Sequence, residues 1–274
     1  MTMNNKIINF KELQVMGVLN LTPDSFYDGG TNDNEETILK KVQKMLDDGA
    51  TFIDIGGYSS RPGADYVSEE EELIRVLPII KLLVQKFPNI IISIDTFRSK
   101  VAQEAIQAGA SIINDISAGN MDEKMFETVA KLQVPYIMMH MQGTPQTMQD
   151  NPNYENVCEE ELQFFTNKIK KLHELNVKDI IIDPGFGFGK TVEHNYELLN
   201  NLEIFQKLNL PILVGFSRKS MINKVINTTP EQALNGTTVL NTLALSKGAN
   251  ILRVHDVKEA REVITLYQKM ISIK

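Results

Sequence analysis

Polar side chains recur along the sequence at the points where short apolar runs end. A single Asp or Asn in such a place usually caps the next helix or forms a turn. Eight such positions in register around one ring are harder to explain in that way, because acids, amides and cations would then converge on one pocket. In chain order the candidates are Asn20, the segment 59–63 (SSRPG), Asp95, Asn114, Met139 with His140, Asp183, Lys219, and Arg253 with His255.

Three of these candidates are hydrogen-bond acceptors. Asp95, Asn114 and Asp183 would place two carboxylates and an amide at the ends of three apolar runs. A carboxylate can accept two parallel hydrogen bonds, which is the converse of the forked donor of arginine. A 2-amino-4-oxo pyrimidine ring, as in guanine or a pterin, presents the matching N–H and NH2 edge. We therefore expect a flat, donor-rich heterocycle as a ligand.

A second group of candidates is cationic. Arg61, Arg253 and His255 can carry positive charge, and His255 stands just before the last helical pattern of the chain. Helix N-termini favour anions, and in barrels a phosphate site often follows the last two strands. One substrate should therefore combine the heterocycle with a phosphate group.

Other motifs are weaker evidence for a site. The segment 184–191 (PGFGFGKT) resembles a phosphate-binding loop, but Pro184 stands where the first glycine belongs. Its glycines more simply let the backbone approach a ligand ring. The four histidines form no H-x-H or H-E-x-x-H pattern, so no zinc site is expected. Cys158, the single cysteine, excludes an internal disulfide and should be inert packing on a helix face.

Eight short apolar runs, each followed by a polar or glycine-rich break and a helical pattern, have to position these residues. The runs are mostly continuous rather than alternating, which is typical of parallel strands covered on both faces. Eight units in this length predict a (β/α)8 barrel, whose active site would lie at the C-terminal ends of the strands. The alternative is an open doubly wound sheet. The expected strands are 14–20, 51–56, 89–96, 111–117, 134–140, 178–185, 210–217 and 250–256.

One predicted helix and one helix face have further consequences. The helical pattern 68–87 contains Pro78, which should kink or split that helix. Leu240, Leu243 and Leu245 in the seventh helical pattern are candidates for a surface between two copies of the chain.

The totals favour a cytoplasmic enzyme with one domain spanning residues 1–274. With 42% hydrophobic residues the chain can bury a large core, whereas its longest apolar runs, about six residues, are too short to span a membrane. The first ten residues lack the pattern of a signal peptide. A net charge of −7 without a basic stripe argues against nucleic acid as a partner.

A set of motifs in fixed order resembles the bacterial dihydropteroate synthase family from about residue 15 to residue 257. The resemblance implies a (β/α)8 barrel, usually dimeric, that joins 6-hydroxymethyl-7,8-dihydropterin diphosphate to p-aminobenzoate and releases pyrophosphate. It also implies Mg2+ as cofactor and sulfonamides as competitors of p-aminobenzoate. The motifs are VMGVLNLTPDSFYDGG, GGYSSRPGA, SIDTFR, INDISAG, IIDPGFGFGK, GFSRKS and RVHDV.

Carried over position by position, the resemblance assigns roles to most of the candidates. The pterin-binding set would be Asp95, Asn114, Asp183 and Lys219, with Met139 and Phe188 as walls of that pocket and Gly215 beside it. Asn20 would bind Mg2+, and Ser60, Arg61, Arg253 and His255 would contact the diphosphate. Phe26, Pro62, Lys219 and Ser220 would surround p-aminobenzoate, and Asp28 would be a further substrate-binding residue. Catalysis would rest on Asn20, Arg61, Lys219, Arg253 and His255.

Two positions depart from the usual family pattern. Ser60 replaces a common Thr and keeps the hydroxyl, whereas Tyr58 stands where Glu or Val is common, which leaves its role open. The sequence offers no activated nucleophile, so departure of the diphosphate before attack is the favoured course and concerted displacement stays open. The alternatives are a methyltransferase domain that binds methyl-tetrahydrofolate and a non-catalytic pterin-binding subunit.

Overall fold

The computed structural model describes residues 1–3, 6–10, 12–21, 32–58 and 66–273 of the chain. Its eight long-range strands coincide with the eight predicted runs, so those predictions are confirmed. A short hairpin of β1 (Thr2–Met3) and β2 (Lys6–Ile7) precedes them and was not predicted. The barrel strands are β3 (Gln14–Asn20), β4 (Phe52–Gly56), β5 (Ile92–Asp95), β6 (Ile112–Asp115), β7 (Tyr136–Met139), β8 (Ile180–Asp183), β9 (Leu213–Val214) and β10 (Ile251–Val254).

The strands form one parallel sheet that curls into a barrel. Their order is β8-β7-β6-β5-β4-β3-β10-β9, so neighbours in sequence are neighbours in space. The two ends of this order meet at a single bridge between Ile182 and Ile212, where the Ile182 N–H donates to the Pro211 carbonyl at 3.0 Å. The predicted (β/α)8 barrel is therefore correct, and the open doubly wound sheet is wrong.

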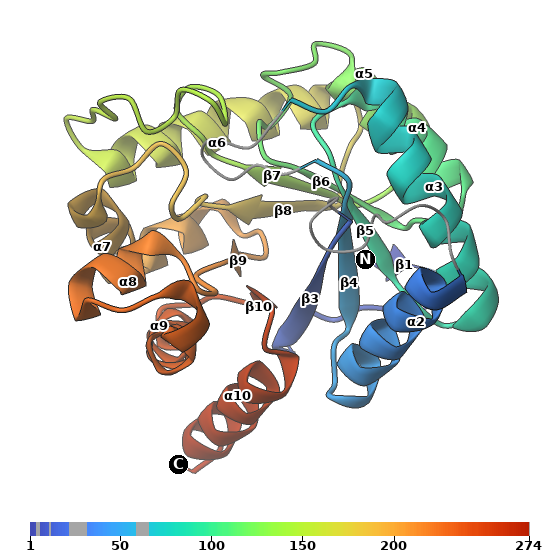
Figure 1. The fold of residues 1–274 in the computed structure, drawn as a ribbon. Helices are drawn as coiled ribbons and strands as arrows, with labels where there is room; N and C mark the ends of the chain where they lie inside the picture. Colours follow the sequence, from blue (N-terminus) through green and yellow to red (C-terminus); the bar gives the residue numbers. More distant parts are fainter. Residues whose placement is uncertain (4–5, 11, 22–31, 59–65, 274) are drawn as a thin grey trace.

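Helices surround the ring of strands (Figure 1). The helix α3 runs unbroken through Pro78, so the expected split is wrong. Proline leaves the carbonyl four residues earlier without its helical partner. That residue, Ile74, lies on the exposed side of α3, where water can reach it. The helices are α2 (Asn32–Asp47), α3 (Glu69–Lys86), α4 (Ser99–Gln107), α5 (Met125–Leu132), α6 (Val157–Glu174), α7 (Val192–Asn200), α8 (Ser220–Ile226), α9 (Leu234–Ser246) and α10 (Val257–Ile271), with 3-10 turns η1 (Leu202–Leu208) and η2 (Pro230–Gln232).

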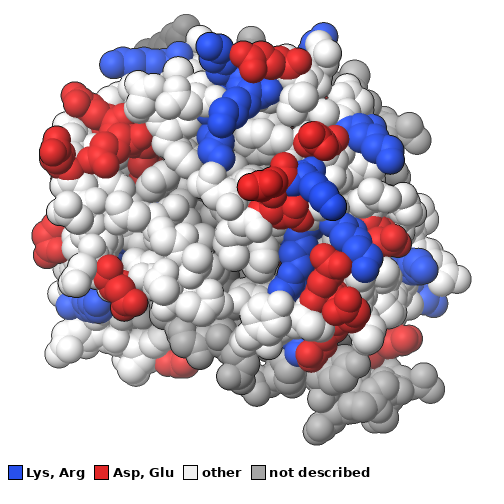
Figure 2. All heavy atoms as spheres, turned by 90° about the horizontal axis from the view of Figure 1, so that it is seen from above, with Lys and Arg blue, Asp and Glu red and all other residues white. Residues whose placement is uncertain are grey.

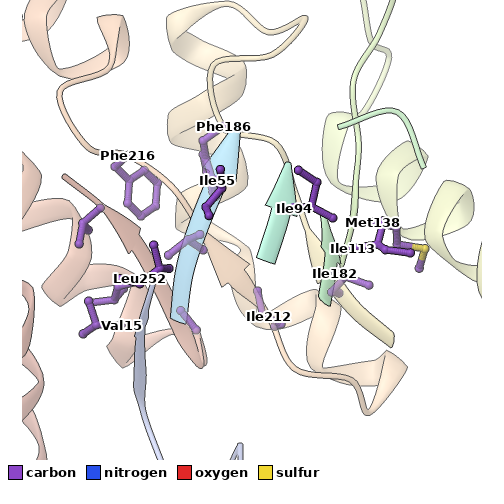
Figure 3. Close-up of a cluster of buried hydrophobic side chains, with 14 of the residues drawn as sticks. Val15, Ile55, Ile94, Ile113, Met138, Ile182, Phe186, Ile212, Phe216 and Leu252 are labelled. Carbon is purple, nitrogen blue, oxygen red and sulfur yellow. The ribbon is translucent and has the colours of Figure 1, made fainter. Parts of the chain in front are cut away.

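The apolar core has two parts, because successive residues of a strand point to opposite faces. One set faces outward and packs beneath the helices; it includes Val15, Ile55, Ile94 and Ile182 (Figure 3). The other set fills the lower half of the barrel interior. Each strand contributes one residue to it, and for β5 this residue is Ile91, which immediately precedes the strand. This lower layer consists of Met16, Phe52, Ile91, Ile112, Ile137, Ile181, Leu213 and Ile251.

The segment before β3 closes the lower end of the barrel. Met1, Ile8 and Phe10 pack against the lower layer, and the ring of Phe10 stacks on that of Phe52 at 6.3 Å between centroids. The bottom of the interior is therefore dry, and ligands must approach from the other end, where the strands terminate.

The described surface carries charges of both signs. In the face shown in Figure 2, basic and acidic side chains are intermixed over its described part. Within the described ranges, no helix is both long enough and apolar enough to cross a membrane.

Candidate active site

The upper half of the barrel interior is polar. Two residues beyond the lower layer on each strand, the inward-facing side chains change from apolar to mostly polar, since residues i and i+2 share a face. This upper layer consists of Val18, Asp54, Ser93, Asn114, Met139, Asp183, Gly215 and Arg253. Five of the predicted site residues therefore lie inside the barrel as one layer rather than only at its rim.

Arg253 is the central cation of this layer. Its Nε donates to Oδ2 of Asp54 at 2.7 Å, and its Nη2 donates to Oδ2 of Asp95 at 2.8 Å. Burial opposes the charge of Arg253, but Asp54 and Asp95 raise its pKa, so it stays protonated. The guanidinium of Arg253 on β10 thus connects its strand to β4, which carries Asp54, and to β5, which carries Asp95.

Asp95 has an unusual pKa in this setting. Burial raises the pKa of Asp95 to about 7, Asp54 adds to the rise, and Arg253 opposes it. Burial also raises the pKa of Asp183, against the pull of Lys219. Strongly shifted carboxyl groups in a cleft mark a candidate functional site. A ligand that donates hydrogen bonds to Asp95 would favour its ionised form.

Asn114 is oriented by the same network. Its Nδ2 donates to Oδ2 of Asp54 at 3.1 Å, so the nitrogen end of the amide faces Asp54 and Oδ1 points elsewhere. Asp183 accepts from the Gly185 N–H at 2.8 Å through Oδ1. The three predicted acceptors, Asp95, Asn114 and Asp183, are therefore gathered in one pocket, each with a fixed orientation.

Lys219 lies beside the acceptors, at the N-cap of α8. Its Nζ donates to the Phe186 carbonyl at 2.5 Å and stands 4.7 Å from the centre of the Phe188 ring. Burial lowers the pKa of Lys219 to about 7, although Asp183 opposes the shift. Gly215 lies beside both cations, since a Cβ at this position would be in ordinary van der Waals contact, 3.8 Å from Cβ of Arg253 and from Nζ of Lys219.

Met139 and Phe188, the predicted walls of the pterin pocket, belong to one apolar cluster at the upper end of the barrel. Met139 is 3% exposed, and Phe188 packs against the cluster from the loop after β8. Tyr58, whose role the sequence left open, belongs to the same cluster, and its hydroxyl accepts from Nε2 of Gln146 at 2.7 Å.

The last two strands end in a second polar group. His255 is exposed, and its Nδ1 lies 2.9 Å from the Ser217 hydroxyl. Arg218 forms a forked pair with Asp256, with N–O distances of 3.0 and 2.8 Å, which ties the loop after β9 to the start of α10. Ser220 is exposed at the first residue of α8.

The remaining predicted residues fall in two classes. Asn20 ends β3 opposite Gly56 of β4 and is half-buried at the rim of the barrel. The others lie outside the described residues, and their assignments stay predictions: Phe26, Asp28, Ser60, Arg61 and Pro62.

The structure corrects two of the expectations drawn from the sequence. His140 ends its strand but does not join the ring of site residues, because its Nδ1 lies 3.1 Å from a carboxylate oxygen of Glu161 on α6. Leu240 and Leu245 are 5% and 3% exposed and belong to the core, which leaves only Leu243 of the three leucines on the surface. Cys158 is confirmed as packing, since burial raises the pKa of its thiol to about 11.

Sequence reasoning missed Asp54 and Ser93. Both are fully buried, and Asp54 organises Arg253 and Asn114. The signal that could have identified them is the period of two along a strand, since each of the two residues follows an apolar residue of the lower layer by two positions. Among the described residues Oδ1 of Asp54 and Oγ of Ser93 have no hydrogen-bond partner. The upper layer therefore retains polar capacity for water or a ligand.

Known proteins share both the sequence and the fold. A match to the family described as "Pterin binding enzyme" covers residues 16–255. Dihydropteroate synthase of Escherichia coli strain K12 is 44% identical over 262 residues, which cover 95% of this chain and 92% of that protein. The Haemophilus influenzae dihydropteroate synthase is 45% identical over 267 residues, with 97% and 96% covered.

Solved structures agree with the sequence matches. The Yersinia pestis dihydropteroate synthase in complex with a sulfonamide drug has a TM-score of 0.93 at 42% identity and covers 99% of both chains. The Xanthomonas albilineans dihydropteroate synthase with 4-aminobenzoic acid has a TM-score of 0.91 at 38% identity, covering 98% of this chain and 97% of that one. Identity at this level over nearly the whole length shows that the chain belongs to the pterin-binding enzyme family, among its dihydropteroate synthases.

Proposed function

We propose that the protein joins 6-hydroxymethyl-7,8-dihydropterin diphosphate to p-aminobenzoate, giving 7,8-dihydropteroate and pyrophosphate, as a transferase of folate biosynthesis. One observation carries this function. Asn114 and Asp183 lie in the upper layer inside the barrel, Asp95 lies at the end of β5, and the half-buried guanidinium of Arg253 binds Asp95 and Asp54, the partner of Asn114. This layer offers acceptors for a donor-rich ring and, above them, cations for a phosphate group.

The pterin ring is held by the acceptors of the upper layer. Oδ1 of Asp183 accepts a hydrogen bond from the Gly185 N–H, and the other carboxylate oxygen has no hydrogen-bond partner among the described residues. That oxygen and the amide oxygen of Asn114 accept from the 2-amino-4-oxo edge of the ring. Met139 and Phe188 supply apolar surface for its faces. A flat ring between a thioether and an aromatic side chain is a favourable arrangement.

The leaving group is stabilised by cations at the rim. Arg253 is half-buried in the upper layer with Asp54 and Asp95 as partners, and His255 is exposed two residues further along the chain. Charge that develops on the departing diphosphate is best neutralised by preorganised cations, and we expect Arg61, which lies outside the described residues, to add a third. The C–O bond between methylene and diphosphate breaks with its electron pair on oxygen. The arylamine nitrogen then forms the new C–N bond and loses a proton.

Magnesium suits this arrangement as a cofactor shared between protein and substrate. No group of three or more His, Cys, Asp or Glu side chains in the described ranges could hold a metal alone. Asn20 supplies one hard oxygen at the rim, and Mg2+ is commonly bound by few protein groups together with substrate phosphates and water. When bound, the ion would neutralise charge on the diphosphate.

Three finer proposals accompany the activity. The protein works in the cytoplasm, which fits its single, buried cysteine. It forms a homodimer through the outer face of α9 and α10, where Val239, Leu243, Leu266 and Met270 are between 45% and 72% exposed. Sulfonamides compete with p-aminobenzoate, which fits the Yersinia pestis relative solved with such a drug.

Pyrophosphate release tests the proposed activity. The purified protein is mixed with the pterin diphosphate, p-aminobenzoate and Mg2+, and pyrophosphate is measured with and without p-aminobenzoate. Release that depends on p-aminobenzoate supports a synthase. Binding of a plain pterin without any release would indicate a non-catalytic pterin-binding subunit instead.

A further inference from the structure

The loop between β8 and α7 is fixed through its carbonyl groups. In this glycine loop, residues 184–190, every carbonyl from residue 185 to residue 189 accepts a hydrogen bond from a side chain. The donors to carbonyls 185 through 189 are, in order, Lys190 at 3.1 Å, Lys219 at 2.5 Å, Gln149 at 2.9 Å, Lys190 again at 3.0 Å and Tyr154 at 2.8 Å.

The glycine loop needs such fixing because of its backbone. Gly185, Gly187 and Gly189 all have positive φ angles, of 68°, 84° and 60°. Glycine adopts this conformation easily but loses more conformational freedom on ordering than other residues. The alternation turns Phe186 into the core and leaves Phe188 at the pocket.

Among the described residues, Lys190 is the only donor that binds two of these carbonyls, and it does so from inside the protein. Its side chain is fully buried, with Nζ 3.1 Å from Oε1 of Glu161 and 3.1 Å from Nδ1 of His140. Glu161 is also fully buried and belongs to α6, which lies behind the loop. A buried ammonium needs a counter-charge, so the Glu161 carboxylate is what allows a lysine here.

This arrangement does not serve to bind phosphate. In a phosphate-binding loop the lysine reaches the phosphates of the ligand. Lys190 is 3% exposed and points instead at the carbonyls of its own loop. The interactions of Lys190 thus support the aromatic wall of the pocket rather than the ligand directly.

We propose that Lys190 is a positioning residue for the pterin: it ties the carbonyls of Gly185 and Phe188 together and so holds the Phe188 ring in place beside the Lys219 ammonium. The inference rests on the proposed function for the identity of the ligand. Its consequence is specific, because the pterin pocket depends on Lys190 while the diphosphate cations of the rim do not.

A double variant tests this role. Lys190→Met alone would leave Glu161 buried without a counter-charge, so Lys190→Met is combined with Glu161→Gln. We expect the double variant to fold and to bind 6-hydroxymethylpterin roughly 10- to 100-fold more weakly, the scale of a small misplacement in a preorganised site. Its affinity for inorganic pyrophosphate with Mg2+, measured calorimetrically, should stay within about twofold, because Arg253 binds Asp54 and Asp95 on other strands and is held independently of the loop.

Two matched controls separate positioning from general stability. Gln149→Ala removes the exposed bond to the Gly187 carbonyl, leaves the Lys190–Glu161 pair intact and should keep most of the pterin affinity. Tyr154→Phe removes one bond from the outer end of the loop and should change the KM for the pterin diphosphate much less than the double variant does. Equal losses of pterin and pyrophosphate affinity, unchanged pterin affinity, or loss of the fold in the double variant would each overturn the proposal. A wild-type protein that binds pterin but releases no pyrophosphate would instead refute only the synthase activity.

Discussion

Replacing Asp54 with asparagine tests whether this carboxylate organises the upper layer. Asp54 is fully buried, and one of its oxygens accepts from both Arg253 Nε and Asn114 Nδ2, at 2.7 and 3.1 Å. An asparagine keeps one acceptor oxygen but carries no charge, so the bonds from Arg253 and Asn114 to that oxygen become weaker. The Asn114 amide is then held less firmly, and a turn of 180° presents its NH2 group instead of its oxygen to the ligand.

The expected loss follows from the kind of bond that is removed. A buried donor that is left without its acceptor costs about 1–3 kcal/mol. If the ligand loses one acceptor through the reorientation of Asn114, pterin affinity should fall by the same amount, roughly 5- to 150-fold. Fluorescence titration of 6-hydroxymethylpterin measures this change directly.

The same variant should change the pH dependence of pterin binding. Asp54 is one of the groups that raise the pKa of Asp95, after burial, to about 7. Without its charge Asp95 would ionise at lower pH, so the acidic limb of the binding profile should move below about pH 7. Ser93→Ala is the matched control, because this neighbour in the upper layer is equally buried but uncharged. An Asp54→Asn variant with the affinity and pH profile of the Ser93→Ala control would refute the reasoning.

Four further predictions concern the same site. Asp183→Asn should weaken pterin binding by about 2–5 kcal/mol, the scale for a buried charged hydrogen-bond partner; full affinity in a fluorescence titration would place the ring elsewhere. Lys219→Met should abolish turnover yet raise the melting temperature of the free protein, most at or below about pH 7 and progressively less as the pH rises toward the ordinary lysine value. The lowered pKa of Lys219, about 7, means that the unfolded chain binds more protons between pH 7 and the ordinary lysine value, and a wild-type stability that does not rise with pH over this window would contradict the prediction. Chelation of Mg2+ should stop pyrophosphate release and leave plain pterin binding nearly unchanged, so activity surviving in EDTA would remove Asn20 from its proposed role. A sulfonamide should bind more tightly when pterin, pyrophosphate and Mg2+ are present together, by about 1–3 kcal/mol in calorimetry; equal affinities with and without them would argue against a p-aminobenzoate pocket that forms only after the first substrate.

The barrel could be predicted from the sequence because each strand has a local pattern and this pattern is repeated eight times. Each strand is buried on both faces, so runs such as residues 89–96 are apolar throughout and stand out from the helices. Eight repeats then leave few topologies, and the short connections favour neighbours in space. The hairpin of β1 and β2 escaped prediction because each strand has only two residues, too few for any periodicity.

The site was predicted less completely, since its residues depend on long-range partners. Asp54 looked like one polar residue inside the apolar run 51–56, and nothing nearby in the sequence reveals that Arg253, almost two hundred residues later, is its partner. The prediction for His140 was wrong for the opposite reason. It stands at a strand end like a site residue, but a glutamate on α6 draws it to the outer side of the barrel. Local patterns cannot separate these two cases, because the outcome depends on which charge lies opposite.

The closure of the barrel between β8 and β9 gives the ligand a mechanical role. β9 is only two residues long, and its ladder to β8 is reduced to the bridge between Ile182 and Ile212. The bond from Lys219 to the Phe186 carbonyl crosses the same seam higher up, where the two following loops meet. A substrate that contacts both loops would therefore link β8 to β9, the pair of neighbouring strands with the least backbone pairing in the barrel. Amide hydrogens along this seam should exchange first in the free protein and gain the most protection when the site is filled.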